Sequence, residues 1–170
     1  MYFLLICIAT SAQDIDLKGA WKFKMDPSDV GLAQNWQNKE FDETVMLPGS
    51  MATNGKGFDI DMNTKWTGQI VDSAWFKAER YAKYREKGNI KSVFWLQPEK
   101  SYVGPAWYSV KFSIPESMNT QNLILSLERP HWKTTVWVDG TRIGMQNSLS
   151  TPHEYSLNNM NKREHTLTIR

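Results

Sequence analysis

The chain has 170 residues, with 20 Lys and Arg against 18 Asp and Glu, so its formal net charge is only +2. This length suits one domain with its own hydrophobic core. Because the charges are balanced, the composition excludes the strongly basic surface with which proteins bind nucleic acid or anionic membranes. The chain has eight Trp and an aromatic content of 12%. Trp is suited both to cores and to wet binding surfaces.

The first residues differ from the rest of the chain. An apolar run over 2–9 is followed by the small residues Thr-Ser-Ala at 10–12, which resembles a secretory signal peptide cut after residue 12. No positively charged residue precedes the run, so a buried strand is the alternative. The sequence predicts a signal peptide over 1–12, a mature domain over 13–170, and a periplasmic or secreted protein.

The same run also bears on membrane anchoring and on cysteine chemistry. It is far shorter than the ~20 apolar residues of a membrane-spanning helix, so no membrane span is predicted. Cys7 is the one cysteine of the chain, and it would leave with the signal peptide. The mature protein is then predicted to contain no disulfide, no Cys-ligated metal and no cysteine nucleophile.

Short segments from residue 20 onward alternate apolar and polar side chains with a period of two, which is typical of half-buried antiparallel strands. The expected strands lie at 21–25, 108–114, 123–127, 134–138 and 166–169. Asp139-Gly140 predicts a tight hairpin turn, with Arg142 and Ile143 on the return strand. Trp21, Trp107 and Trp137 lie within these patterns, and we expect them in the core.

One segment departs from the strand pattern. Asp72-Ser73 is typical of a helix cap, and a short helix or ordered loop is expected to run from there to a stop at Gly88. Turn clusters at 47–50 and 53–57 separate strands on the N-terminal side. Many short strands with one short helical insertion predict an all-β fold, a jelly-roll β-sandwich.

The sequence offers little support for metal chemistry. Asp59, Asp61 and Asn63 imitate the start of a calcium loop, but Thr64 stands where such a loop needs Gly and Ile70 where it needs a bidentate Glu. Glycine-rich phosphate or dinucleotide motifs are absent from the sequence. We therefore predict no metal site and no cofactor.

The candidate acid and base residues are few. The histidines His131, His153 and His165 lack the short spacing of a zinc site, and each is expected to bond a backbone group or pack at a strand end. Glu128 and Glu154 are the acids of interest, because glycoside cleavage needs two carboxyl groups. Both are expected in surface or strand-end ion pairs, and no catalytic residue is predicted.

Several motifs occur in the order seen at the start of glycoside hydrolase family 2 enzymes, the β-galactosidase and β-glucuronidase type. They are Leu17–Pro27, Leu47–Met51, Gly104–Tyr108, Phe112–Pro115, Leu125–Arg129, Thr135–Gly140, Ile143–Gly144 and Thr151–Leu157. Each motif alone is weak, but their order and spacing over 17–170 resemble the N-terminal sugar-binding domain of that family.

This resemblance implies a jelly-roll sandwich of the galactose-binding type, followed in the whole enzyme by an immunoglobulin-like domain and a catalytic barrel. The barrel supplies both carboxylates, and no Glu here follows an Asn as the family's general acid does. The resemblance implies an accessory domain that forms part of the substrate pocket. By analogy, Asn89, Trp95, His131 and Trp132 are the predicted carbohydrate-binding residues, since aromatic faces and amides suit sugars.

Two alternatives remain open. The Trp content also suits an autonomous carbohydrate-binding module, and exposed aromatic residues such as Trp132 also suit contacts with a neighbouring domain. The end of the chain at Thr168–Arg170 falls within a strand pattern. We therefore expect that the domain is truncated at this end and that the parent protein is a glycosidase, whereas this fragment alone is inactive.

Overall fold

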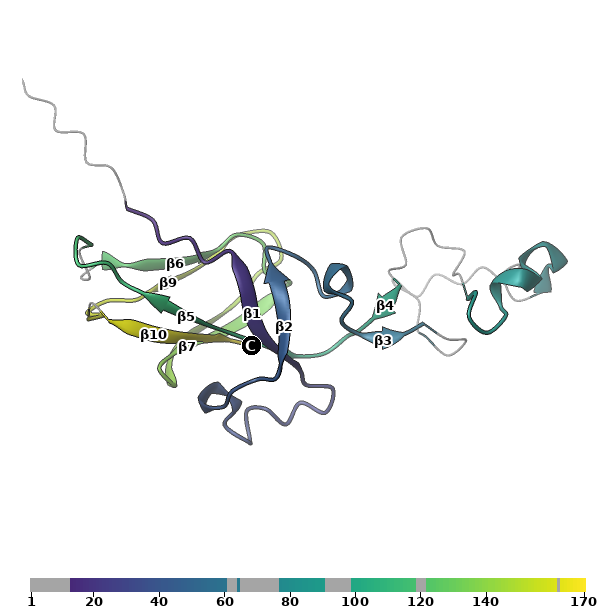
Figure 1. The fold of residues 1–170 in the computed structure, drawn as a ribbon, viewed down its shortest axis with the longest axis horizontal. Coiled ribbons are helices and arrows are strands. Elements are labelled where there is room, and N and C mark those ends of the chain that lie inside the picture. The colour runs from purple at the N-terminus through teal and green to yellow at the C-terminus, as the bar shows by residue number, and fades with distance from the viewer. Residues whose placement is uncertain (1–12, 61–63, 65–76, 91–98, 119–121, 162) are drawn as a thin grey trace, which may run out of the picture. The chain divides into compact units, whose positions relative to one another are not determined.

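The computed structural model describes residues 13–60, 64, 77–90, 99–118, 122–161 and 163–170. The described residues form two compact units, one within 19–108 and the other comprising 13–18 and those within 109–170. Both consist of short antiparallel strands joined by turns and short 3-10 helices (Figure 1). The expected all-β sandwich fold is confirmed.

The unit over 19–108 is built around a pair of antiparallel strands. Its elements are β1 (Gly19–Met25), η1 (Trp36–Asn38), β2 (Glu43–Leu47), η2 (Ala52–Asn54), β3 (Phe58–Asp59), η4 (Glu79–Tyr84), β4 (Lys100–Ser101) and the first residues of β5 (Ala106–Ser113). Trp21 lies opposite Val45 in the β1–β2 ladder, and both are buried. The alternation expected around Trp21 and Phe23 is confirmed, since Phe23 is buried as well.

The loop after β1 is held by a buried carboxylate. Asp26 is 1% exposed, and its oxygens accept hydrogen bonds from the backbone N–H groups of Val30 and Gly31, both at 2.8 Å. The indole N–H of Trp107 donates to the same carboxylate at 3.0 Å. A side chain at Gly31 would place its Cβ 2.5 Å from the Trp107 ring. Glycine is therefore required there by the close approach of the loop to the indole.

The expected helical insertion is present as a 3-10 helix. η4 covers Glu79–Tyr84 and follows Ala78, which has an extended conformation. Asp72 and Ser73, which were expected to cap it, lie outside the described residues. η1 and η2 were not predicted, because helices of one turn leave no periodicity in a sequence.

The second unit contains the remaining strands. They are the end of β5, then β6 (Ile124–Leu127), β7 (Lys133–Val138), β8 (Thr141–Asn147), β9 (His153–Ser156) and β10 (Glu164–Ile169). β5, β10, β7 and β8 are neighbours in one sheet, and β6 pairs with β9 in another (Figure 1). Tyr155 on β9 packs against Gly144 on β8, where a Cβ would lie 3.2 Å from its ring. The two sheets therefore pack face to face.

The predicted hairpin is confirmed. Val138 and Thr141 are register partners, and the two residues between them have positive φ, 49° at Asp139 and 76° at Gly140. Two positive φ values in a two-residue loop fit the twist of the flanking strands. The three Trp residues expected in the core are buried, with 4% exposure for Trp21, 0% for Trp107 and 4% for Trp137.

Replacement of Asp26 by Asn should destabilise the chain by about 2 to 3 kcal/mol, because the amide group would face N–H donors and leave buried groups unpaired. Urea denaturation measures this difference. Asp42→Asn makes the same change at an exposed residue and should alter stability by less than about 0.5 kcal/mol. Equal effects of the two substitutions would contradict the role assigned to Asp26.

Candidate functional site

The predicted carbohydrate-binding residues fall in different parts of the molecule. Asn89 belongs to the unit over 19–108, whereas His131 and Trp132 belong to the other unit. Trp95 lies outside the described residues. The Asn89 side chain donates its amide N–H to the Lys83 carbonyl at 2.7 Å, next to the end of η4. Asn89 thus stabilises its own loop, and its contact with a sugar stays a prediction.

His131 and Trp132 form an exposed aromatic pair immediately before β7. Their ring centroids are 5.0 Å apart with an interplanar angle of 56°, and Trp132 is 54% exposed. The Trp132 carbonyl accepts the N–H of Ser148 at 3.0 Å, which ties this loop to the loop after β8. Leu149, 64% exposed, follows directly in that second loop. We call His131, Trp132, Ser148 and Leu149 the Trp132 surface.

A buried polar network contacts the Trp132 surface through Ser148. His153 is 0% exposed, and its Nδ1 lies 2.6 Å from the Thr134 hydroxyl. The same hydroxyl lies 2.6 Å from the hydroxyl of Tyr155. The Nε2 atom of His153 lies 3.0 Å from the Ser148 carbonyl oxygen. The side-chain polar atoms of His153, Thr134 and Tyr155 thus all have partners within this network, as buried polar groups require.

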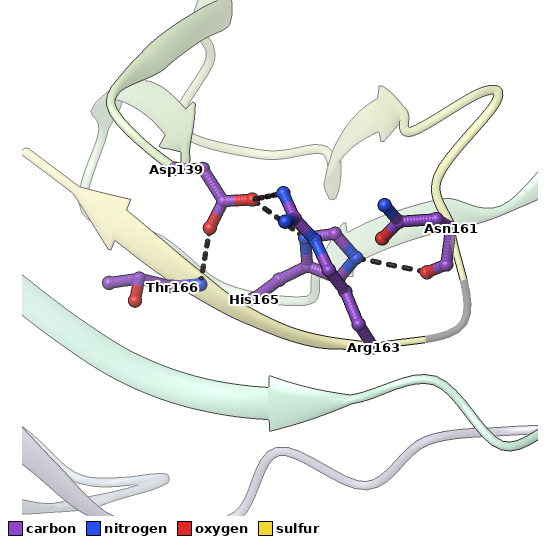
Figure 2. Close-up of polar contacts among 5 residues, drawn as sticks. All are labelled: Asp139, Asn161, Arg163, His165 and Thr166. Carbon is purple, nitrogen blue, oxygen red and sulfur yellow. Dashed lines mark hydrogen bonds and ion pairs between the residues drawn. The ribbon is translucent and has the colours of Figure 1, made fainter.

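A second polar group, which we call the Asp139 cluster, lies at the other end of β7. It comprises Asp139, Asn161, Arg163, His165 and Thr166 (Figure 2). One carboxylate oxygen of Asp139 accepts the backbone N–H of Thr166 at 2.8 Å. The other lies 2.7 Å from Nδ1 of His165 and 3.4 Å from the guanidinium of Arg163.

His165 is the buried member of the Asp139 cluster. It is 4% exposed and packs against Phe112 with ring centroids 5.7 Å apart. Its Nε2 lies 3.0 Å from the Asn161 carbonyl oxygen, so both ring nitrogens face acceptors. A neutral imidazole carries one N–H, and the tautomer decides which of the two acceptors receives it.

The environment of Asp139 changes its acidity. Partial burial by itself raises the pKa of the carboxyl, but the N–H of Thr166, the hydrogen bond and charge of His165 and the charge of Arg163 outweigh burial. The net effect lowers the pKa of Asp139 below its ordinary value of 3.8. Hydrogen bonds to the charged form of an acid act in this direction. Asp139 is therefore ionised at neutral pH.

A surface depression of about 450 Å³ lies beside the Asp139 cluster. Its polar wall contains the side chains of Arg163, Asn159 and Asn161, and its apolar wall those of Ile143 and Met160. Small-ligand pockets in proteins have volumes of about 300 to 1,000 Å³. The depression therefore has the size and the mixed lining of a small-ligand site.

The sequence did not point to the Asp139 cluster. Asp139 was read only as a turn residue, and His165 as a structural histidine at a strand end. The expectation that His153 and His165 bond backbone groups is confirmed by their contacts with Ser148 and Asn161. The cluster joins residues 26 positions apart, and no local spacing records such a contact.

The acids considered for catalysis lie at the surface. The Glu128 side chain is 81% exposed and contacts Arg129 at 3.5 Å, as expected for a surface ion pair. Glu154 is exposed on β9. Of the residues that resembled a calcium loop, Asp59 pairs with Lys100, whereas 61–63 lie outside the described residues.

Within the described part of the chain, no three His, Cys, Asp or Glu side chains form a group suited to a metal ion. Among the same residues, none of the helices has the length and apolar character needed to cross a bilayer.

Comparisons with known proteins give one consistent result. No protein-family model matches the chain. The β-glucuronidase of Paenibacillus borealis is 22% identical over 156 residues, which cover 91% of this chain and 20% of that protein. The crystal structure of Ruminococcus gnavus β-glucuronidase superposes with a TM-score of 0.58 at 18% identity, covering 90% of this chain and 20% of that one.

A β-glucuronidase from an uncultured Clostridium species gives a TM-score of 0.58 at 22% identity, with coverage of 98% of this chain and 23% of that chain. The resemblance inferred from the sequence motifs is thus confirmed, and the fold is that of a β-glucuronidase segment. The chain spans about a fifth of the length of these relatives.

Asp139→Asn should lower the free energy of unfolding at neutral pH by roughly 1 kcal/mol. The effect is modest because the Asp139 side chain is 37% exposed and solvent screens its charge. The lowered pKa of Asp139 means that its carboxylate stabilises the fold above the unfolded value of 3.8. This contribution is lost as the pH falls through the folded value.

The difference in free energy of unfolding between the Asp139→Asn variant and the unsubstituted chain should therefore shrink as the pH falls from about 5 to about 3. Urea denaturation at several pH values, with Asp42→Asn as the exposed control, measures the change. A deficit that stays constant over this range would contradict the electrostatic role of Asp139.

Proposed function

We propose that the chain is the N-terminal accessory domain of a family 2 glycoside hydrolase of the β-glucuronidase type. In this role it forms one wall of the substrate pocket, while a catalytic barrel elsewhere in the same protein performs hydrolysis of the O-glycosyl bond. The apolar segment over 2–9 supports export of this protein.

The observation that carries the proposal is the pattern of coverage. Nearly the whole chain, 91%, aligns with only 20% of the Paenibacillus borealis β-glucuronidase. The R. gnavus β-glucuronidase structure is covered in the same proportion. A domain that occurs as part of a longer glycosidase is expected to support the function of that enzyme, and fold alone does not define its chemistry.

The carboxylates of the described residues support an accessory role over a catalytic one. A general acid in a glycosidase is kept protonated by an apolar, shielded environment. Glu128 instead lies 81% exposed beside Arg129, and Glu154 is exposed on β9. Asp26 is buried, but its oxygens accept N–H groups of Val30, Gly31 and Trp107, which assigns it to the structure of its loop.

The Trp132 surface favours a second candidate function, an autonomous carbohydrate-binding module. An exposed indole of this kind suits the apolar face of a pyranose ring, and Trp132 is 54% exposed next to His131. The same surface also suits packing against a neighbouring domain of the parent enzyme. Binding measurements separate these roles.

The first experiment combines an assay of 4-nitrophenyl β-D-glucuronide and β-D-galactoside hydrolysis with calorimetric titration of galactose, mannose and short β-linked oligosaccharides. The accessory role predicts a folded chain with no turnover and no saturable binding of these neutral sugars. Turnover abolished by Glu128→Gln or Glu154→Gln would overturn the proposal.

A matched pair of variants tests the alternative module. If neutral sugars bind, Trp132→Ala should weaken binding by about tenfold or more, as expected for the loss of about 1 to 3 kcal/mol of stacking. Ile124→Ala removes another exposed apolar side chain, 64% exposed on β6, and should leave binding unchanged. This outcome would favour an autonomous module over an accessory wall.

A further inference from the structure

We propose that the segment after β2 closes the free edge of that strand and so prevents a second copy of this chain from pairing with it. We call Ser50, Thr53, Asn54 and Lys56 the edge cap. All of them lie within the unit over 19–108. The inference concerns the self-association of the chain, and it depends neither on the accessory role nor on any ligand.

β2 is a strand with one open side. Among the described residues its one strand neighbour is β1 (Figure 1). Met46 directs its backbone N–H and C=O away from β1, toward the side chain of Asn54. Bonded and unbonded pairs alternate along an antiparallel ladder, so Thr44, two residues away, faces the same edge. Without a cap, a row of backbone groups of this kind is a template for strand addition.

The first argument is that Asn54 occupies the backbone positions that an added strand would use. Its side-chain carbonyl accepts the Met46 N–H at 2.7 Å, and its amide donates to the Met46 carbonyl at 3.1 Å. A carboxamide presents a donor and an acceptor side by side, as the backbone of a neighbouring strand does. Asn54 therefore completes the ladder at Met46 with a side chain, which unlike a strand offers no further edge.

The second argument is that the loop itself holds Asn54 in this position. The Asn54 amide also donates to the Ser50 carbonyl at 2.9 Å. The N–H and the hydroxyl of Thr53 bond Ser50 in turn, at 3.1 and 2.9 Å. Gly49 is needed for this close approach, because a Cβ there would lie 2.6 Å from the Met46 carbonyl oxygen. The edge cap is therefore preorganised.

The third argument is a fixed charge further along the same strand. The Lys56 side chain is 20% exposed and pairs with Glu43 at 2.6 Å, and its ammonium lies 5.7 Å from the centre of the Phe23 ring. An added strand would have to displace or desolvate this ion pair. Lysine at a sheet edge is a known means of preventing edge-to-edge pairing. The edge cap thus contacts β2 near both of its ends.

The residues of β2 indicate which partner the edge cap excludes. The Met46 side chain is 57% exposed, and Thr44 is exposed as well. An apolar and a β-branched side chain on an open edge favour strand pairing. Two identical strands satisfy one another in antiparallel pairing, because each residue meets its counterpart across a two-fold axis. The excluded partner is therefore β2 of a second copy.

The first test uses the unsubstituted chain and amide hydrogen exchange followed by NMR. After correction for intrinsic rates, the Met46 N–H should exchange at least about tenfold more slowly than the Thr44 N–H, because Asn54 bonds only the first of them. Equal exchange at the two positions would show that the edge cap is open, and it would overturn the proposal without any substitution.

Two variants open the edge cap by different routes. Asn54→Ala removes the carboxamide, whereas Gly49→Ala retains it and places a methyl group against the Met46 carbonyl. In sedimentation velocity over a range of concentrations, both variants should self-associate at least about tenfold more tightly than the unsubstituted chain. Circular dichroism verifies that each variant is folded.

Two further variants distinguish edge pairing from general destabilisation. Asn89→Ala removes another carboxamide of the same unit, which donates to the Lys83 carbonyl at 2.7 Å, and it should leave association unchanged. Addition of Thr44→Pro to Asn54→Ala should abolish the new association. Proline removes an N–H that an added strand needs, and it is tolerated on an edge strand.

The proposal is wrong if folded Asn54→Ala and Gly49→Ala associate no more tightly than the unsubstituted chain. It is equally wrong if Asn89→Ala associates to the same extent, since destabilisation would then be the cause. Association of Asn54→Ala that persists with Thr44→Pro would assign it to another surface and contradict the role of β2. None of these outcomes bears on the accessory role, which the hydrolysis assay tests.

Discussion

In the unit that includes residues 109–170, the carboxylate of Asp139 is the contact on which the candidate site depends. It follows β7 in a turn whose positive φ of 49° directs the chain back on itself. Its two oxygens bind Thr166 N–H on β10 and the ring of His165, and His165 in turn contacts the Asn161 carbonyl. One ionised side chain thus fixes a hairpin, a strand and a loop relative to one another, and charge-assisted hydrogen bonds are the stronger kind.

At the opposite end of β7, hydrogen bonds among buried side chains replace the ionised carboxylate. There the buried groups are uncharged hydroxyls and an imidazole, with His153, Thr134 and Tyr155 in mutual contact. Such a network tolerates no missing partner, since an unpaired polar group in the core costs about 1 to 3 kcal/mol. It holds the loop whose Ser148 N–H binds the Trp132 carbonyl. A rigid base of this kind allows an exposed indole to keep a fixed orientation.

Both ends of one strand therefore carry polar or aromatic surface on a rigid support, which suits a domain that contacts carbohydrate or a neighbouring domain. The relatives that the chain resembles are glycosidases about five times its length, since 20% of each is covered. The accessory role rests on this coverage.

The sequence by itself determined the strands near 21–25, 108–114, 123–127, 134–138 and 166–169, the Asp139-Gly140 hairpin, the three core Trp residues and the resemblance to family 2 glycosidases, but not β2, β3, β4 or β9. These follow from alternation, turn chemistry and motif order, all of which act between residues close in the chain. Only the tertiary structure brought Asp26 to Trp107 and His165 to Asp139, which are separated by 81 and 26 positions. Asp and His look alike in a sequence whether they are exposed or buried, because burial and partner choice depend on which distant segments pack together.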